Sequence, residues 1–210
     1  MEELKLNYKN MEAFLKIYLP IYLVFYLLLA FVVPSYRTHK QTGINPVTFG
    51  KRDNAHDYIG FLMKILIALL FISIIFYSFG YKVYQYSSPI LFLENEILIY
   101  IGLVIIHLAL IWIFVAQVQM SKSWRIGIDE KNSTELVTKG IFSISRNPIF
   151  LGMILTVLGL FLILPNAVTF FLSFATYFII QIQIRLEEEF LEKQHGTIYL
   201  NYKSNTKRLL

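Results

Sequence analysis

Five long apolar stretches divide this chain, and they constrain its fold more than any other feature. Three of them, Phe14–Val33, Ile59–Tyr81 and Ile97–Val118, have the length of about 20 residues that a helix needs to cross a bilayer. Two more, Ile149–Leu164 and Ala167–Ile184, are separated by only two residues. So short a link permits only a tight helical hairpin. The first arm of this hairpin is short, so it need not cross the whole bilayer.

Composition supports the same interpretation. Hydrophobic residues make up 56% of the 210 residues and charged residues only 16%, which excludes an ordinary soluble domain. We therefore predict an all-α integral membrane protein with about five transmembrane helices, the last two forming the hairpin. The chain has no cysteine, so it has no disulfide and no thiol nucleophile.

Basic residues predict the orientation of the spans. Of the 19 Lys and Arg residues, 14 fall in residues 34–58, in residues 119–148 and from residue 185 onward. Positive residues are retained on the cytoplasmic side, so these three segments and the C-terminus are expected in the cytoplasm and the N-terminus outside. A net charge of +5 spread over loops favours attraction to a membrane surface and not nucleic-acid binding. A composition rich in Lys, Asn and Ile points to a bacterial inner (plasma) membrane.

Polar side chains collect at the end of the last span. Gln181 and Arg185 are four residues apart, and so are Gln183 and Glu187, so each pair shares one side of a helix. Ionisable groups near lipid cost about 2.5–3.5 kcal/mol each and usually pair or line a cavity. Two interpretations remain open: an interfacial helix end paired with itself or with water, or a cavity that needs both signs of charge.

A second polar feature is the turn Arg146-Asn147-Pro148. Asn is a good N-cap and Pro suits the first helical position, so a helix is predicted to begin here. The free amides of its first turn could hold an anionic group, or the turn could simply initiate the helix. Since the hairpin is antiparallel, residues near 147 and near 185 should lie at the same depth on neighbouring helices. Amide donors, a guanidinium and carboxylates would then meet in one site that suits an amino-acid zwitterion.

Two segments carry a family resemblance. The segments "LVTKGIFSISRNPIFLG" (136–152) and "EEEFLEKQHGTIYLNY" (187–202) resemble the membrane methyltransferases typified by isoprenylcysteine carboxyl methyltransferase and, more distantly, the phospholipid N-methyltransferases. The positions that match the family pattern are Leu136, Val137, Thr138, Gly140, Phe142, Arg146, Pro148, Glu187, Glu188, Leu191, Gly196, Tyr199 and Tyr202. Asn147, Phe150 and His195 depart from it, standing where the family usually has His, Tyr and Phe.

The resemblance implies a methyl transfer from S-adenosyl-L-methionine to a lipophilic acceptor, with the cofactor in a cytoplasm-facing pocket. The residues it assigns to the cofactor are Leu136, Val137, Phe142, Arg146, Asn147, Pro148, Phe150, Glu187 and Glu188. Glu187 would hold the cofactor's amine, the amides near Asn147 its carboxylate, and Glu188 would order the helix end. Arg185 or Gln183 would face the group that is methylated, and that acceptor could be a carboxylate, an amine or a thiol.

The resemblance also implies one membrane methyltransferase domain over residues 1–210. Residues 1–118 would form three N-terminal spans with their loops, and residues 119–210 the cofactor-binding segment, the hairpin and the C-terminal tail. Two other functions remain open: a sterol-reductase-like enzyme that uses NADPH, and a non-enzymatic scaffold or binding protein. His107 could line the cavity or be a packing residue, and loop 37–57 could cover the substrate entrance. No set of residues has a compelling metal-ligand spacing, and no metal is predicted.

Overall fold

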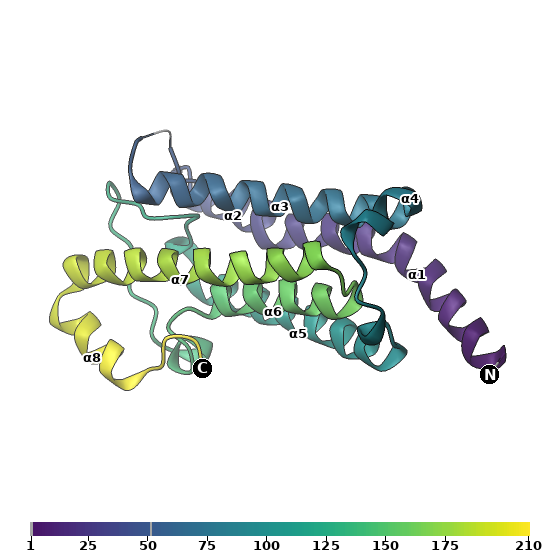
Figure 1. Cartoon of the computed structure of the whole chain (residues 1–210). Coiled ribbons are helices and arrows are strands. Elements are labelled where there is room, and N and C mark those ends of the chain that lie inside the picture. Colours follow the sequence, from purple (N-terminus) through teal and green to yellow (C-terminus); the bar gives the residue numbers. More distant parts are fainter. Residues whose placement is uncertain (1, 51) are drawn as a thin grey trace.

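The computed structural model describes residues 2–50 and 52–210, and over these residues the protein is a helical bundle without a β-strand (Figure 1). Lys51, part of the predicted basic loop, lies outside them. α1 (Glu2–Leu27) continues through a π-helical turn (Leu28–Val32) into α2 (Val33–Thr42). The other helices are α3 (Ala55–Phe79), α4 (Tyr81–Tyr84), α5 (Glu96–Met120), α6 (Pro148–Ile163), α7 (Ala167–His195) and α8 (Thr197–Asn205).

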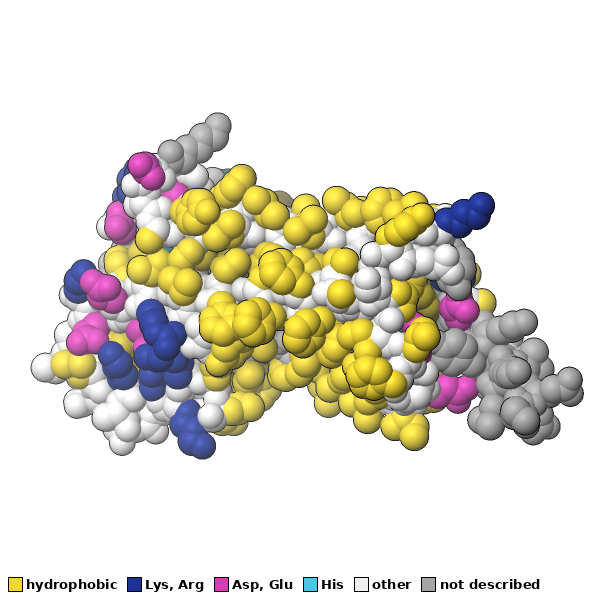
Figure 2. Space-filling model, in the orientation of Figure 1, with side chains coloured by type: hydrophobic (Ala, Val, Ile, Leu, Met, Phe, Trp, Pro, Cys, Tyr) yellow, Lys and Arg dark blue, Asp and Glu magenta, His cyan; other side chains and the backbone are white. Residues whose placement is uncertain are grey.

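Four of the described helices are long and apolar enough to cross a membrane: Asn10–Thr42, Ala55–Phe79, Glu96–Ser123 and Ala167–His195. The fifth predicted span is α6, an apolar helix of only 16 residues. The all-helical membrane fold is thereby confirmed, and the first arm of the hairpin is short, as expected. Figure 2 shows hydrophobic side chains over the middle of the bundle, with charged side chains gathered toward its ends.

A π-helical turn interrupts the first span for an identifiable reason. Pro34 has no N–H, so the carbonyl of Ala30, four residues earlier, loses its helical donor. The buried side chain of Gln117 on α5 supplies a replacement, because its Nε2 donates to the Ala30 oxygen at 2.6 Å. Turns of this kind are frequent at functional sites, and this one lies against the cavity described below.

Close packing of α5 against α6 depends on glycine. A Cβ placed on Gly102 of α5 would come within 2.6 Å of the Gly159 carbonyl oxygen on α6, and one on Gly152 within 2.4 Å of Ile113 Cγ1. Small residues let helix backbones approach closely, which is how membrane helices gain packing energy. These two helices therefore form a firm support for the start of α6.

α6 and α7 form the predicted hairpin. Asn166 caps α7 by accepting from the amide of Thr169 at 2.9 Å, and the Thr169 hydroxyl in turn accepts from the Asn166 amide, a complete capping box. At the other end of the hairpin, Arg146 lies against Glu188, with 2.8 Å between Nη2 and Oε1. The prediction that the beginning of α6 and the end of α7 lie side by side is therefore confirmed.

Candidate active site

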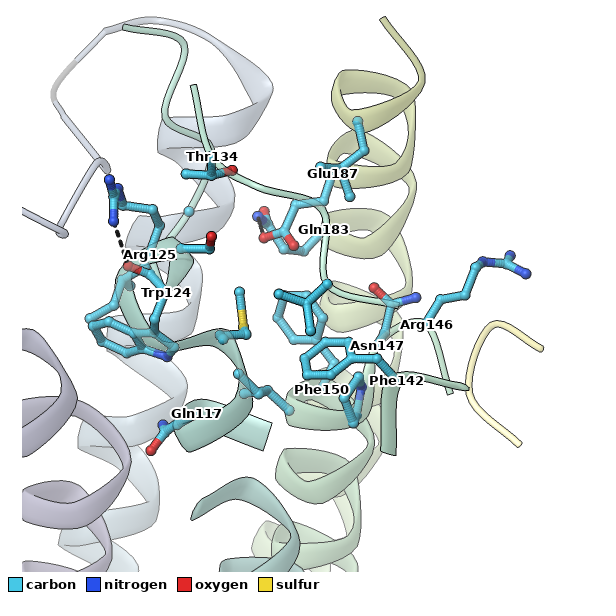
Figure 3. Close-up of a pocket in the computed structure, with 18 of the residues that line it drawn as sticks. Gln117, Trp124, Arg125, Thr134, Phe142, Arg146, Asn147, Phe150, Gln183 and Glu187 are labelled. Atoms are coloured by element: carbon cyan, nitrogen blue, oxygen red, sulfur yellow. Dashed lines mark hydrogen bonds between the residues drawn. The ribbon is translucent and has the colours of Figure 1, made fainter. Parts of the chain in front are cut away.

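A large cavity lies where α6 begins and α7 approaches its end. It holds about 1130 Å³ of empty space, a volume that includes space open to solvent. Its walls come from the π-helical turn, from α3, α5, α6, α7 and α8, and from the segments that connect α2 to α3 and α5 to α6. Figure 3 shows the side chains that converge on it.

Most of the residues singled out in the sequence line this cavity. They are Leu136, Val137, Phe142, Arg146, Asn147, Pro148, Phe150, Gln183 and Glu187. Residues up to 51 positions apart in the chain, Leu136 and Glu187, thus meet at one place. Glu188 and Arg185 do not line it, and each has a structural reason that is given below.

Gln183 and Glu187 form the polar corner of the cavity. Gln183 Nε2 donates to Glu187 Oε1 at 2.8 Å, and Gln183 Oε1 is buried with no hydrogen-bond partner among the described residues. No cation of the described part of the chain pairs with Glu187. A buried acceptor without a donor and an unpaired carboxylate both cost free energy. This corner is therefore suited to a ligand that brings hydrogen-bond donors and a positive charge.

Asn147 occupies the N-cap position of α6, and Pro148 follows at its start, as predicted. The Asn147 side chain does not cap the helix, which corrects the expectation from the sequence. Instead, Nδ2 donates to the backbone oxygen of Arg208 at 3.0 Å and more weakly to Glu188 at 3.5 Å. The first-turn amides of α6 are consequently left without a side-chain acceptor, at a helix end whose dipole favours an anion.

Arg146 lies at the edge of the cavity, with its guanidinium directed away from the cavity centre (Figure 3). Nε and Nη2 donate to Glu188 Oε1 at 3.1 and 2.8 Å, and Nη1 donates to the backbone oxygens of Lys203 and Thr206. Glu188 is only 3% exposed and also pairs with Arg208. Glu188 is thus occupied as an ion-pair partner of Arg146 and Arg208, and it does not line the cavity to which the sequence assigned it.

Arg185 does not reach the cavity. Its Nη1 donates to the backbone and side-chain oxygens of Gln181 at 2.6 and 3.0 Å on the outer side of α7. Residues two positions apart on a helix point about 200° apart, so Arg185 and Gln183 cannot face the same site. Of the two residues expected to face the acceptor, only Gln183 lies at the cavity.

Two connecting segments cover the cavity. Thr48 and Ile126 join them through an N–H···O bond of 3.0 Å, and Phe49, Trp124 and Arg125 line the cavity beneath. His56 lies at the junction: Nε2 accepts from the Ile128 amide at 2.8 Å. Therefore loop 37–57 does take part in covering the cavity.

Asp129 organises the second of these covering segments. It accepts from Arg125 Nε at 3.0 Å and from the backbone amides of Lys131 and Asn132. Burial raises the pKa of this carboxyl, but the hydrogen bonds from Asn132 and Arg125 outweigh burial and hold the pKa below its usual value. Arg125 is therefore engaged by a carboxylate of its own segment while it lines the cavity.

A second, mostly apolar cavity adjoins the first. It lies among α1, α3, α6 and α7, holds about 620 Å³ of empty space, and shares Phe31, Met63 and Met153 with the first cavity. These three residues could not be found from the apolar pattern of the sequence, because an apolar residue facing a cavity has the same pattern as one facing lipid or core. Phe31 belongs to the π-helical turn, and the unpaired Ala30 carbonyl expected from Pro34 was the only signal that could have found it.

Other candidate residues have structural roles. His107 is exposed on α5 and does not line the cavity; its Nε2 lies 2.6 Å from the Tyr18 hydroxyl, and its Nδ1 contacts the Leu103 carbonyl. The Tyr202 hydroxyl donates to the Phe142 carbonyl at 2.6 Å, and burial raises the pKa of Tyr202 to about 12. Among the described residues no group of three or more His, Cys, Asp or Glu residues is placed to hold a metal ion.

The geometry defines a membrane-embedded helical protein with a polar pocket at one end and an apolar cavity beside it. Residues 97–198 match the model of the phospholipid methyltransferase family, which confirms the resemblance read from the sequence. The match covers nearly all of α5 together with α6 and α7, so over these residues the chain is similar to membrane methyltransferases. A comparison with the curated proteins finds no match to this chain.

Proposed function

We propose that the protein transfers a methyl group from S-adenosyl-L-methionine to a lipophilic acceptor. One observation carries the proposal: an unpaired carboxylate, an uncapped helix N-terminus and aromatic side chains line the same cavity. An amino-acid zwitterion joined to a flat heteroaromatic ring needs this combination. The family match agrees with it, because it identifies a methyltransferase.

The residues present fit the cofactor group by group. Glu187 and the free Oε1 of Gln183 would accept from its ammonium group. The first-turn amides of α6, after Asn147 and Pro148, would face its carboxylate. Phe142 and the other apolar side chains of the wall would receive the adenine.

The second cavity supports a lipophilic acceptor. Its lining is dominated by Leu, Ile, Met and Val side chains, and it shares Phe31, Met63 and Met153 with the first cavity. A hydrocarbon chain placed there would bring its polar end toward Gln183 and Glu187. Burial of each CH₂ group contributes about 0.8 kcal/mol, so such a cavity favours an acceptor with a chain.

The bound cofactor would supply the methyl group, already activated on a sulfonium. The contribution of the chain is to hold acceptor and cofactor in line and to keep water out, which alone can account for several kcal/mol of the barrier. Tyr202 keeps its proton, since its hydroxyl is committed to the Phe142 carbonyl. The proposal therefore rests on positioning by the cavity walls and not on a tyrosine base.

An NADPH-dependent reductase is less well supported by the same cavity. The 2′-phosphate that distinguishes NADPH is usually held by a free basic side chain such as Arg. Arg125 and Arg146 line the cavity, but the first is paired with Asp129 and the second with Glu188, at 3.0 and 2.8 Å. Neither guanidinium is free to bind a phosphate.

The pocket would open toward the cytoplasm of a bacterial cell, at the end of the bundle where basic side chains gather in Figure 2. Arg52 and Arg208, from the loop after α2 and the segment after α8, both belong to this end, in agreement with the positive-inside rule. The cofactor would then be drawn from the compartment in which it is made.

Calorimetry of the purified protein in nanodiscs with S-adenosylmethionine, S-adenosylhomocysteine and NADPH tests this proposal. We expect saturable binding of the first two and none of NADPH. Labelled methyl transfer into a total lipid extract, followed by mass spectrometry, would then identify the acceptor. Binding of NADPH alone would refute the proposal, and binding of none would favour a scaffold.

A further inference from the structure

A segment that follows α8 is joined to the turn that precedes α6. The Arg146 amide donates to the Lys207 carbonyl at 2.9 Å, and Ser145 and Lys207 form a parallel bridge. Figure 1 shows this part of the chain folding back beside the beginning of α6. Residues 206–208 therefore lie directly behind the wall of the proposed cofactor site.

This segment decides what the Asn147 side chain does. An Asn at an N-cap position normally accepts from the amides of the first helical turn. Here Asn147 Nδ2 donates to the Arg208 carbonyl at 3.0 Å, and the side chain makes no cap bond. The backbone of Arg208 thus holds the Asn147 side chain away from the helix axis and leaves the first turn of α6 open.

The Arg208 side chain fastens the segment a second time. Its Nη2 lies 2.8 Å from Glu188 Oε2, and its Nε also contacts that carboxylate. Glu188 already has a buried cation partner in Arg146, which is 8% exposed against 36% for Arg208. Removal of the Arg208 side chain would leave Glu188 paired with Arg146, so the end of α7 would keep a neutralised carboxylate. The segment of residues 206–208 would lose its ion pair with α7.

We propose that Arg208 is a positioning residue of the cofactor site. Through Glu188 and through its own carbonyl it fixes the turn at residues 145–147, and that turn presents Asn147 and Pro148 to the cavity. The inference rests on the proposed function, since it concerns the affinity of the same site for its cofactor. Arg208 itself does not line the cavity and acts only through its neighbours.

The test compares Arg208→Ala and Arg208→Lys with Lys203→Ala as matched control. Lys203 belongs to the same part of the chain and also pairs with a glutamate, Glu192 at 3.0 Å, but at the surface. The probe is S-adenosylhomocysteine, titrated by calorimetry into the protein in nanodiscs. We expect Arg208→Ala to weaken binding about tenfold, as loss of a supporting hydrogen-bond partner commonly does. Arg208→Lys should lose less, about threefold, because one ammonium cannot form the forked contact, and Lys203→Ala should bind like the wild type.

Hydrogen exchange gives a readout that needs no cofactor. We expect the amides of residues 144–150 to exchange faster in Arg208→Ala and to be unchanged in Lys203→Ala, with similar thermal midpoints for both. Wild-type affinity for S-adenosylhomocysteine in Arg208→Ala would overturn the positioning role. If Arg208→Ala does not fold, Arg208→Lys carries the test, and wild-type affinity in that variant overturns it.

The two proposals fail in different ways. If the wild-type protein itself does not bind S-adenosylhomocysteine, the proposed function fails, and the exchange experiment alone judges Arg208. Faster exchange at residues 144–150 would then still support the positioning role, and unchanged exchange would refute it.

Discussion

Gln183 and Glu187 lie one turn apart on α7, and the amide of Gln183 donates to the carboxylate of Glu187 at 2.8 Å. This contact fixes the glutamine amide so that Oε1, and not Nε2, is left without a partner. The polar corner of the cavity therefore presents oxygen acceptors. It also lacks a basic partner among the described residues, so its ligand is expected to be a cation.

Glu187→Gln should weaken binding of S-adenosylhomocysteine by about 10 to 100-fold, the range expected for loss of one charge-assisted hydrogen bond. Calorimetry measures the dissociation constant. Glu189→Gln is the matched control, because Glu189 is on the same helix but pairs with Lys193 at the surface. Equal affinities of the two variants for S-adenosylhomocysteine would show that Glu187 does not contribute to cofactor binding.

Phe31→Trp should reduce the space where the two cavities adjoin and discriminate against long acceptor chains. Phe31 lines both cavities, whereas Val32, beside it in the same π-helical turn, is 54% exposed, so Val32→Trp is the control. Once an acceptor is known, we expect kcat/KM to fall about tenfold for long-chain acceptors relative to short-chain analogues. A uniform loss over all chain lengths would contradict a role for the second cavity in chain binding.

Gly102→Ala should destabilise the bundle by about 1–3 kcal/mol, because the added methyl group would overlap the Gly159 carbonyl at 2.6 Å. Thermal unfolding in detergent measures the change. Gly80→Ala is the control, since its Cβ would meet no atom closer than 3.4 Å. A Gly102→Ala protein as stable as Gly80→Ala would show that α5 and α6 can separate without cost.

His56→Phe should loosen the cover of the cavity while leaving the cavity wall intact. The phenyl ring can keep the stack on Phe49, whose ring centroid lies 4.5 Å away, but it cannot accept from the Ile128 amide. We expect faster hydrogen exchange at residues 126–128 and a higher KM for the cofactor. Unchanged exchange there would mean that the contacts of Thr48 suffice to hold the two segments together.

Acid should loosen the segment around Asp129. Because its pKa is lower in the folded protein than in the unfolded chain, Asp129 contributes stability that is complete above the unfolded value of about 3.9 and is lost as pH falls through the folded value. Trp124, buried beside this segment, reports the change by fluorescence in a Trp112→Phe background. Asp129→Asn should abolish the pH dependence below about pH 4, and a persistent transition would assign it to another carboxyl.

The hairpin and its consequence could be predicted from the sequence. A link of only two residues, Pro165 and Asn166, makes the helices on either side antiparallel neighbours, so residues near 147 and near 185 were expected at the same depth. The contact between Arg146 and Glu188 agrees with this. Periodicity also placed Gln183 and Glu187 on one side of α7. These predictions succeeded because they depend on local geometry, which short-range spacing determines.

Two features could not be obtained in the same way. The Asn147 side chain leaves its capping role for a carbonyl 61 residues further along the chain, and no local pattern records such a partner. The apolar cavity is likewise invisible in the sequence, because its residues resemble those that face lipid. The position of Arg185, in contrast, could be partly predicted from the sequence. Residues two positions apart on a helix point in opposite directions, so only one of Arg185 and Gln183 could face the site.

The shortness of α6 has a consequence for where the reaction takes place. Sixteen residues span about 24 Å, whereas the hydrocarbon layer is about 30 Å thick. With its far end tied to the loop before α5 through the Pro165 carbonyl, α6 cannot reach the opposite surface of an undeformed bilayer. Local thinning of the bilayer is one way in which a helix this short is accommodated. A lipid head group would then lie closer to the proposed cofactor site while its acyl chain stays in the hydrocarbon layer.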